Sequence, residues 1–428
     1  MRISVIGAGY VGLVTAAALA NKGHNVIVVD TDETRVGMVK QKKSPILEEG
    51  LHDILSNCID SNHLRATGDY REILDTDITL ICVGTPSNSD GSMNLSHIKE
   101  SAKDIGRVLR AESGHYTVVV RSTVVPGTTE GIIIPAMEQY SGKKAHVDFD
   151  VAVNPEFLQE GKALHCFFNP DRIIIGEEAQ RAGDMIKELY QGISAPIVRT
   201  GIATAEMIKF ASNAFLATKI SFINEIGNIC QKLGIDVYDV VKGVGLDYRI
   251  GQHFLRAGIG FGGSCLPKDL KALVHASRHL GYQPLVLESV LEVNRNQILN
   301  MLRMVEEKLG NLEDKTICVL GLAFKPNTDD IRNSPALEVI RLLMEKGASV
   351  KAYDPLAMPN AKSALSEQVE YCRNAKEAVS NCDCVLVLTE WDEFKEESLY
   401  HGKVVFDGRR VLDPKEARAF CDYHGICW

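Results

Sequence analysis

Cys265 is the residue of this sequence that most directly suggests covalent chemistry, because it lies in a glycine-framed segment, Gly260–Asp269. The chain also opens with the spacing Gly7-x-Gly9-x-x-Gly12, which is typical of a turn that receives a dinucleotide. An enzyme that oxidises an alcohol only to an aldehyde needs no thiol. A thiolate that adds to the aldehyde forms a thiohemiacetal, from which a second hydride can leave. The two features together predict a four-electron oxidation of an alcohol to an acid.

Further polar residues stand where they could take part in such a reaction. Glu156 follows an expected strand over 150–153, so its carboxylate could act as a base, position a water or simply be a solvated loop acid. Lys209 and Asn213 are one turn apart on an expected helix over 205–233 and share a face. That helix is mostly apolar, and a polar pair that is buried needs other polar groups as hydrogen-bond or charge partners. The pair could stabilise an oxyanion, or Lys209 could be an ordinary snorkelling lysine, and the residues alone leave both open.

The N-terminus must supply the elements that position a dinucleotide. We expect strands over 3–6 and 25–29 with a helix over 13–20 between them. Gly7 makes the tight turn, Gly9 lets the backbone approach the pyrophosphate, and Gly12 allows the helix to pack closely on the strand. The N–H groups and the positive dipole end at the start of the helix then face the phosphates.

The residue that ends the second strand indicates which cofactor binds. Asp30 can bond both ribose hydroxyls and would repel a 2′-phosphate, so NAD is favoured over NADP, although Arg35 nearby weakens this argument. Two further strands, over 78–83 and 116–120, are expected in the same sheet, and Thr85 and Thr123 follow them. Because ligands bind at the carboxyl ends of parallel strands, both threonines are candidates for contact with the cofactor or the active site, or are plain turn hydroxyls.

The last third of the chain looks like a second α/β unit. A glycine turn follows its first strand, but the full glycine fingerprint is missing, so this unit is expected to close a cleft and bind the rest of the substrate. The expected elements are strands over 316–321, 349–355, 384–389 and 403–407 and a helix over 336–346. The helix over 205–233 is apolar on more than one stripe, which suggests an interdomain or intersubunit position. We therefore predict an α/β protein with two doubly wound Rossmann-like domains joined by a long central helix.

Composition limits the remaining possibilities. The chain of 428 residues is expected to form two or three domains, and its net charge of −9 argues against a nucleic-acid partner. Eleven scattered cysteines read as reduced thiols, and no Cys/His set has zinc-site spacing, so no metal is expected. No apolar run reaches the roughly 18 residues needed to span a membrane, and the first residues run directly into a strand rather than a leader. A cytoplasmic enzyme without a membrane partner is expected.

With these motifs in view, the chain resembles the nucleotide-diphospho-sugar 6-dehydrogenases, the family of the UDP-glucose and GDP-mannose 6-dehydrogenases. The resemblance covers essentially the whole length. It is carried by Gly7–Gly12, Val83–Pro86, Ser122–Val124, Asn154–Leu158, the Lys209/Asn213 helix, Phe261–Cys265 and Gly321–Lys325. It implies NAD-dependent oxidation of a sugar C6 alcohol to a carboxylate with two NAD per sugar. It also implies a homodimer, or a higher homo-oligomer, assembled through the central helix.

The same resemblance implies a role for each matching residue. Cys265 is similar to the family nucleophile, Lys209 and Asn213 to the groups that stabilise the oxyanion, and Asp269 to the acid that organises base and water. Glu156 and Thr123 match the residues that hold the hydrolytic water. Implied cofactor contacts are Gly7, Gly9, Tyr10, Val11, Gly12, Asp30, Arg35, Thr85, Thr123, Glu160, Lys268 and Arg332. Implied substrate contacts are Phe157, Leu158, Glu160, Lys209, Asn213, Arg249, Phe254, Gly262, Lys325 and Arg409, and the resemblance implies that Arg249 crosses from a neighbouring subunit.

The motifs that bear on the identity of the nucleotide sugar favour two different substrates. Segments 245–251, 169–172 and 324–330 look like the UDP-glucose branch, whereas 142–149 and 425–428 look like the GDP-mannose branch. The first set is expected nearer the substrate, which favours UDP-glucose, followed by GDP-mannose and then an N-acetylated UDP-hexosamine. A two-electron hydroxyacid-type dehydrogenase and a non-catalytic dinucleotide sensor are the alternatives of other kinds.

A division into three parts follows from these observations. We expect an NAD-binding domain over 1–198, a central helical dimerisation region over 199–300 and a nucleotide-sugar-binding domain over 301–428. The stretch 300–315 is the expected boundary before the last domain. Whether the terminal Cys427-Trp428 is a buried anchor or a frayed end is left open by the residues.

Overall fold

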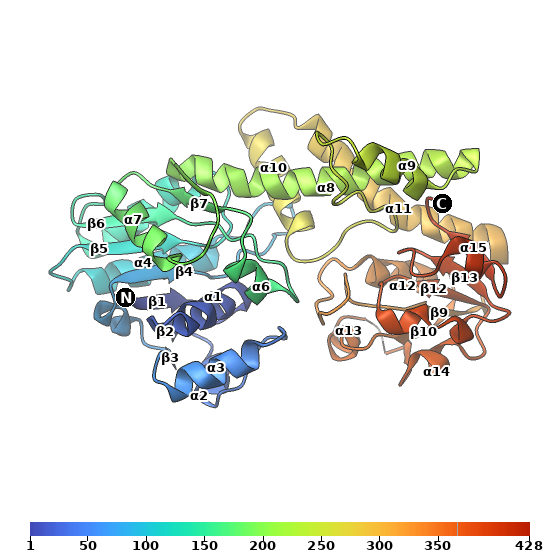
Figure 1. Ribbon diagram of the computed structural model, residues 1–428, viewed down its shortest axis with the longest axis horizontal. Helices are drawn as coiled ribbons and strands as arrows, with labels where there is room; N and C mark the ends of the chain where they lie inside the picture. Colours follow the sequence, from blue (N-terminus) through green and yellow to red (C-terminus); the bar gives the residue numbers. More distant parts are fainter. Residues whose placement is uncertain (366) are drawn as a thin grey trace. The chain divides into compact units, whose positions relative to one another are not determined.

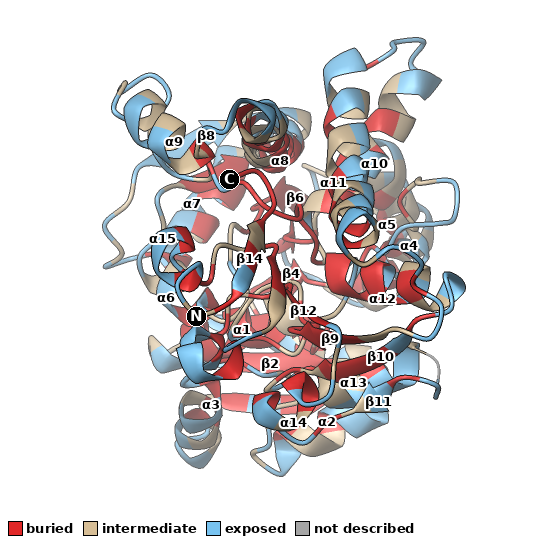
Figure 2. Cartoon of the chain, turned by 90° about the vertical axis from the view of Figure 1, so that its right-hand side faces the viewer, coloured by how far each residue is buried: buried red, intermediate tan, exposed pale blue. Residues whose placement is uncertain are grey.

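The structure, a computed structural model, describes residues 1–365 and 367–428. The chain forms two compact units, Met1–Ser212 and Asn213–Trp428 (Figure 1). Each unit is built on its own sheet, and the buried residues, red in Figure 2, follow the strands of both sheets. No helix of the described residues is both long and apolar enough to cross a membrane.

The first sheet has the strand order expected for a dinucleotide-binding fold. Among the described residues eight strands pair in the order β3-β2-β1-β4-β5-β6-β7-β8, and all neighbours are parallel except β6 and β7. The first six positions of this order are those of a doubly wound Rossmann sheet. The strands are β1 (Arg2–Ile6), β2 (Asn25–Val29), β3 (Leu64–Thr67), β4 (Ile78–Ile81), β5 (Tyr116–Val120), β6 (Phe149–Val153), β7 (Ile173–Gly176) and β8 (Ile197–Thr200).

Helices cover both faces of this sheet. Alternate strand residues enter two separate cores, as Val119 and Val118 of β5 do, so both faces of the strand are buried. The strands accordingly read as near-continuous Val/Ile runs rather than as an alternation with polar residues. The helices are α1 (Tyr10–Asn21), α2 (Glu33–Lys40), α3 (Leu51–Asp60), α4 (Ser96–Leu109), α5 (Ile134–Ser141), α6 (Ala163–Phe168) and α7 (Gln180–Leu189).

The second unit repeats this strand order without the full glycine fingerprint. Its described strands pair in the order β11-β10-β9-β12-β13-β14, all parallel. The strands are β9 (Thr316–Leu320), β10 (Ser349–Tyr353), β11 (Glu370–Tyr371), β12 (Cys384–Val387), β13 (Val404–Asp407) and β14 (Asp422–Gly425). The helices around them are α12 (Pro335–Glu345), α13 (Met358–Ala364), α14 (Ala375–Val379) and α15 (Pro414–Ala417). Two Rossmann-like sheets are therefore present, as predicted.

Helices of very different length precede the second sheet. They are α8 (Ile202–Leu233), α9 (Val237–Gly245), α10 (Leu266–His279) and α11 (Leu285–Leu309). The division between the two compact units falls within α8, and α11 runs through residue 300, where the sequence suggested a boundary. The loop after Leu309 does separate α11 from β9.

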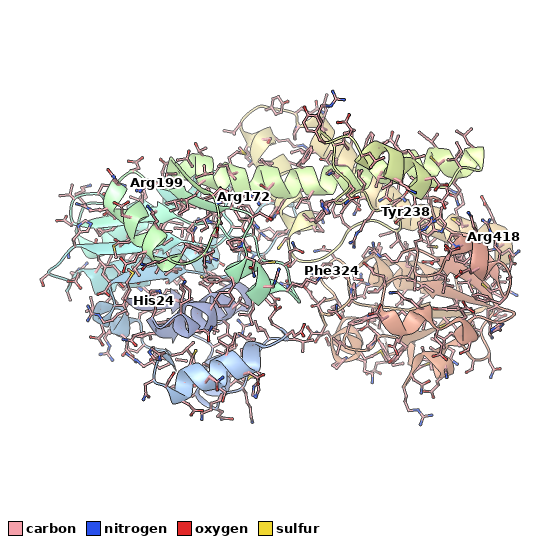
Figure 3. The ribbon with its side chains drawn as sticks, viewed as in Figure 1. His24, Arg172, Arg199, Tyr238, Phe324 and Arg418 are labelled. Carbon is pink, nitrogen blue, oxygen red and sulfur yellow. The ribbon has the colours of Figure 1, made fainter. Side chains whose placement is uncertain are left out.

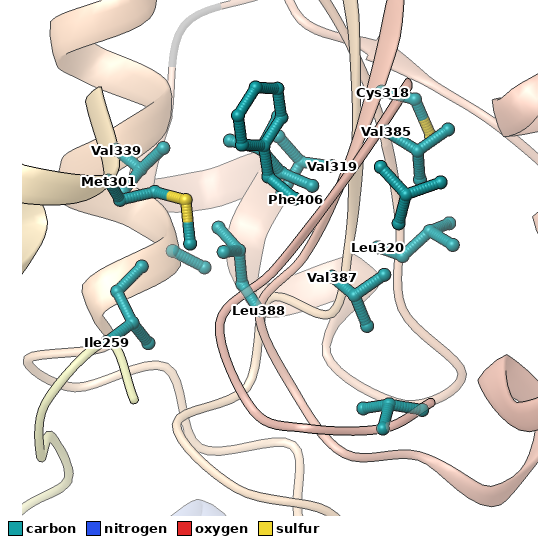
Figure 4. Packing of buried hydrophobic residues seen from close by; sticks show 14 of the residues in the cluster. Ile259, Met301, Cys318, Val319, Leu320, Val339, Val385, Val387, Leu388 and Phe406 are labelled. Carbon is teal, nitrogen blue, oxygen red and sulfur yellow. The ribbon is translucent and has the colours of Figure 1, made fainter. Parts of the chain in front are cut away.

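The segment that leads toward Cys265 is fixed to the core of the second unit. Ile259 and Met301 pack with Leu388 and Phe406 in one cluster (Figure 4). The Ile259 amide also donates to the Gly408 carbonyl at 2.9 Å. The backbone just before the glycine-framed run is thus tied to the end of strand β13.

The C-terminus is a packed anchor rather than a frayed end. Cys427 is fully buried and Trp428 nearly so. The Trp428 indole N–H donates to the Tyr423 hydroxyl at 2.9 Å, and its ring meets that of Tyr238, labelled in Figure 3, edge-on at 5.7 Å. Arg410 lies over both of these rings. The question that the residues left open is settled by this packing.

Candidate active site

The turn between β1 and α1 is shaped to receive a pyrophosphate. Gly7 has φ +104°, a conformation that side chains rarely adopt, and a Cβ on Gly12 would lie 1.9 Å from the Gly7 carbonyl oxygen. Gly9 occupies the N-cap of α1 and offers no side chain to the first N–H groups of the helix. These donors remain for an anion, which the helix dipole also favours. The residues present therefore fit a dinucleotide.

Asp30 lies beside this turn. Its carboxylate accepts hydrogen bonds from the backbone N–H of Ala8 and, at 2.8 Å, of Asp32. Arg35 forms an exposed ion pair with Asp32 at 3.4 Å rather than with Asp30. Asp30 is thus held against the glycine turn, and its contact with a ribose stays a prediction. Tyr10 and Val11, in the first turn of α1, are half-buried.

The ends of β4 and β5 are joined by the two threonines that the sequence singled out. The Thr85 hydroxyl donates to the carbonyl of Thr123 at 2.8 Å, and the Ser122 hydroxyl donates to the carbonyl of Val83 at 2.7 Å. Both loops therefore lie together at the carboxyl edge of the first sheet, where ligands bind in this class of fold.

Glu156 and Lys209 form a buried ion pair. The Lys209 Nζ lies 3.4 Å from the Glu156 carboxylate, and at most 7% of either side chain is exposed. The ring of Phe157 has the Lys209 ammonium 5.1 Å from its centroid and the Arg172 guanidinium, labelled in Figure 3, at 3.9 Å. A cavity of about 50 Å³ is lined by Glu156, Phe157, Leu158 and Arg172. Lys209 is therefore not a snorkelling surface lysine, and its partner Glu156 borders a cavity.

Asn213 and Asp269 form a second buried pair, in the second unit. The Asn213 amide donates to the Asp269 carboxylate at 2.6 Å, and Lys268 donates to the other carboxylate oxygen at 2.6 Å. Cys265 is exposed and occupies the N-cap of α10. The Asp269 amide donates to the Cys265 carbonyl at 2.9 Å, so the two residues are one helical turn apart. A helix N-terminus favours the thiolate form of a cysteine.

The glycine-framed loop is held by contacts that its sequence only partly indicated. A Cβ on Gly262 would lie 2.3 Å from the Asn333 carbonyl oxygen, and one on Gly263 would lie 2.7 Å from the Phe324 ring. Asn294 of α11 clamps the backbone of Phe261, accepting from its N–H at 2.7 Å and donating to its carbonyl at 3.0 Å. Sequence reasoning missed Asn294, because nothing about an asparagine in an amphipathic helix marks it as a clamp.

The remaining predicted substrate residues belong to several elements. Arg409 donates to the carbonyl of Gly260 at 2.8 Å and thereby also supports the loop of Cys265. Arg249 is exposed and pairs with Asp247 of its own loop, while Phe254 has φ +64°. Lys325 lies over the Phe324 ring, and Arg332 forms a two-pronged contact with Asp330. Glu160 is half-buried in the loop after β6.

Comparison with known proteins identifies the family. Sequence models of the UDP-glucose/GDP-mannose dehydrogenase family match its NAD binding domain over residues 1–194, its central domain over 203–296 and its UDP binding domain over 318–414. A UDP-glucose 6-dehydrogenase of Haloferax volcanii and a GDP-mannose 6-dehydrogenase of Pseudomonas savastanoi are each 43% identical to the chain, over all of both sequences. A UDP-glucose dehydrogenase structure from Pyrobaculum islandicum superposes with a TM-score of 0.95 at 43% identity, covering 100% of this chain and 98% of that one. The chain belongs to the UDP-glucose/GDP-mannose dehydrogenase family, and its first 194 residues are an NAD-binding domain.

Proposed function

We propose that the enzyme oxidises the C6 alcohol of UDP-glucose to the carboxylate of UDP-glucuronate, with NAD as the oxidant. The observation that carries this proposal is the combination of an exposed thiol at a helix N-terminus with two buried polar pairs, Glu156–Lys209 and Asn213–Asp269. A dehydrogenase that stops at a ketone or an aldehyde has no use for the thiol. The full-length match to the family supports the same reaction class.

UDP-glucose is favoured over GDP-mannose by where the branch-specific motifs lie. Arg172, from the UDP-glucose-like segment 169–172, stacks on Phe157 and lines the cavity beside Glu156. The GDP-mannose-like segment 142–149 enters β6 at the end opposite Glu156, and 425–428 forms the C-terminal anchor. One motif of the first kind, 169–172, therefore lines the cavity beside Glu156, whereas the motifs of the second kind lie elsewhere in the fold. Sequence identity does not separate the two branches, since it is 43% to a member of each.

The proposed chemistry assigns a task to each residue. NAD, when bound, accepts a hydride in each of the two oxidations. The C6 hydroxyl gives up its proton to water as the first hydride leaves, and Lys209 and Asn213 stabilise the negative charge that develops on the C6 oxygen. The Cys265 thiolate forms a C–S bond with the aldehyde carbon, and loss of the second hydride leaves a thioester. Water, deprotonated by Glu156 and positioned with Thr123, adds to the thioester, and the C–S bond breaks to return the thiolate. Asp269 orients Asn213 and Lys268 throughout.

Binding is assigned to the remaining residues on the same basis. We propose that the glycine turn with Tyr10, Val11, Asp30 and Arg35 holds the cofactor, together with Thr85, Thr123, Glu160, Lys268 and Arg332. The sugar nucleotide would be held by Phe157, Leu158, Glu160, Arg249, Phe254, Gly262, Lys325 and Arg409. Basic side chains among these suit a pyrophosphate, which an acidic chain must attract locally.

The larger-scale assignments are proposals as well. The parts 1–198, 199–300 and 301–428 would bind NAD, form the dimer and bind the nucleotide sugar, respectively. Exposed Phe215, Phe222 and Ile229, seven residues or about two turns apart on α8, support assembly through that helix. A cytoplasmic location is supported by the cysteines, which are free thiols throughout the described residues.

The experiment that tests this function compares Cys265→Ala with Cys382→Ala. Cys382 is a matched control, because it is a partly exposed thiol far along the chain from Cys265 whose hydrogen bond with Cys318 lowers its pKa. Cys265→Ala should bind NAD normally and form no acid from UDP-glucose, while Cys382→Ala should keep the full rate of acid formation. Acid formation by Cys265→Ala at the parent rate would overturn the proposal.

A further inference from the structure

Glu48 is a buried carboxylate that no motif of the sequence explains. It lies in the segment between α2 and α3 and is 8% exposed, whereas its neighbour Glu49 is exposed to solvent. Burying a charged carboxylate costs several kcal/mol unless hydrogen bonds replace the lost water. The groups that contact Glu48 therefore indicate which parts of the structure its buried carboxylate holds together.

Those contacts come from two segments that serve different ligands in the proposed function. The Tyr10 hydroxyl donates to Oε2 of Glu48. The Gly161 amide nitrogen lies 2.8 Å from Oε2 of Glu48 and 2.8 Å from the Tyr10 hydroxyl oxygen. Oε1 of Glu48 accepts hydrogen bonds from the amides of Ala163 at 2.6 Å and Leu164 at 3.4 Å. Four donors thus surround one carboxylate, a number that suits the lone pairs of its two oxygens.

Tyr10 connects this cluster with the cofactor turn. It is the first residue of α1 and follows Gly9, so its backbone lies where a pyrophosphate meets the helix N-terminus. Burial and the hydrogen bond to Glu48 raise the pKa of the Tyr10 hydroxyl, which keeps it protonated as a donor. An anion that fixes the first turn of α1 therefore also fixes the phenol that reaches Glu48.

The amides connect the cluster with the loop that follows β6. Gly161 ends the stretch that begins at Glu156 and carries Phe157 and Glu160, and Ala163 begins α6. Gly161 has φ +77°, so the chain turns sharply at the point where Glu48 holds it. The loop proposed to contact the sugar is thereby attached, through one carboxylate, to the first turn of the cofactor helix.

We propose that Glu48 is a positioning residue that couples occupancy of the dinucleotide turn to the geometry of the 156–164 loop. The role of this coupling in catalysis rests on the proposed function. The coupling between the dinucleotide turn and the loop does not depend on which reaction the enzyme catalyses. Because binding free energies are linked reciprocally, each ligand strengthens binding of the other through the Tyr10–Glu48–Gly161 contact.

Hydrogen exchange of the loop amides, measured in the full-length protein with and without NAD, tests the coupling directly. A peptide covering Gly161, Ala163 and Leu164 should exchange more slowly when NAD is added to the parent protein. In Glu48→Gln and in Tyr10→Phe the NAD-induced protection should be lost, while Glu49→Gln should behave like the parent. Tyr10→Phe keeps the Glu48 carboxylate and its amide partners, so this variant still tests the coupling if Glu48→Gln fails to fold.

A binding measurement gives the size of the effect. Addition of NAD should lower the Kd of the parent protein for its nucleotide sugar by a factor of about 5 or more, a typical allosteric coupling, and that factor should fall to about 1 in both variants. Protection and coupling that survive in Tyr10→Phe and Glu48→Gln would overturn the proposal. If the enzyme turned over neither UDP-glucose nor GDP-mannose, that result would contradict the proposed function. The hydrogen-exchange result would still test the coupling independently.

Discussion

At the scale of single residues, the charged groups of the candidate site are buried in pairs. Glu156 pairs with Lys209, and Asp269 receives hydrogen bonds from Asn213 and Lys268. Removing one partner of a buried pair leaves the other uncompensated, which typically costs about 3–5 kcal/mol of folding free energy. Variants at these positions should therefore lose both stability and rate, and the two effects must be measured separately.

Lys209→Ala should lower the rate of acid formation by about 10²–10³-fold, because one donor to the developing oxyanion is lost. It should also lower the free energy of unfolding by about 3 kcal/mol, because Glu156 stays buried without its cation. Steady-state kinetics and urea unfolding measure the two effects. Lys232→Ala, an exposed change near the end of the same helix, should leave both unaltered, and equal losses in the two variants would contradict the assignment.

Asp150 provides a prediction of pH dependence in the first unit. Burial alone would raise the pKa of its carboxyl, but hydrogen bonds from Arg181 and His115 outweigh burial and hold the pKa below its usual value. The charged form is thus stabilised in the folded state, and this contribution is present above the unfolded pKa of about 3.9 and lost as pH falls through the lower folded value. Asp150→Asn should cost about 1.5–3 kcal/mol at pH 7, and the difference from the parent in urea unfolding should shrink below about pH 4. A difference that grows on acidification would contradict this account.

At the scale of elements, α8 is shaped by what packs against it. A Cβ on Gly227 would lie 2.5 Å from the Cβ of Cys427, so the C-terminal anchor needs a glycine at this turn of the helix. The close approach shows how tightly the last residues pack against this helix.

Gly227→Ala should therefore destabilise the protein by about 1–3 kcal/mol through overpacking, even though alanine favours a helix. Gly243→Ala is the matched control, since Gly243 lies in α9 with open space around its Cβ position. That change should stabilise the protein by roughly 0.5–1 kcal/mol. Calorimetric unfolding of both variants shows whether each change raises or lowers the free energy of unfolding. Stabilisation by Gly227→Ala would contradict the close packing of Gly227 against Cys427.

The elements that could be predicted from the sequence are those with local signals. The glycine turn, the strands around it and α8 were predicted to within a few residues, because apolar runs and glycine spacing specify them directly. The antiparallel junction of β6 and β7 and the contacts of Glu48 and Asn294 were not, since each depends on residues far apart in the chain. A buried glutamate in a loop carries no local pattern that separates it from a solvated one.

At the scale of the whole molecule, an exposed apolar stripe on α8 predicts self-association. Phe215, Phe222 and Ile229 are each at least half exposed in the single chain. Phe222→Glu should convert a dimer into a monomer in light scattering after size-exclusion chromatography, because a buried unpaired carboxylate would cost several kcal/mol at the interface. Val147→Glu, at an exposed apolar residue outside α8, should leave the mass unchanged. A parent protein that is monomeric, or a dimer that tolerates Phe222→Glu, would contradict assembly through this face.

The reaction as a whole is tested most directly by its stoichiometry. We would measure NADH released and acid formed per sugar nucleotide consumed, with UDP-glucose and GDP-mannose in parallel. We expect two NADH and one carboxylate per UDP-glucose, with GDP-mannose inert. Two NADH per GDP-mannose with UDP-glucose inert would keep the role of Cys265 but overturn the substrate. One NADH per sugar without acid would contradict the central claim that the thiol carries a second oxidation.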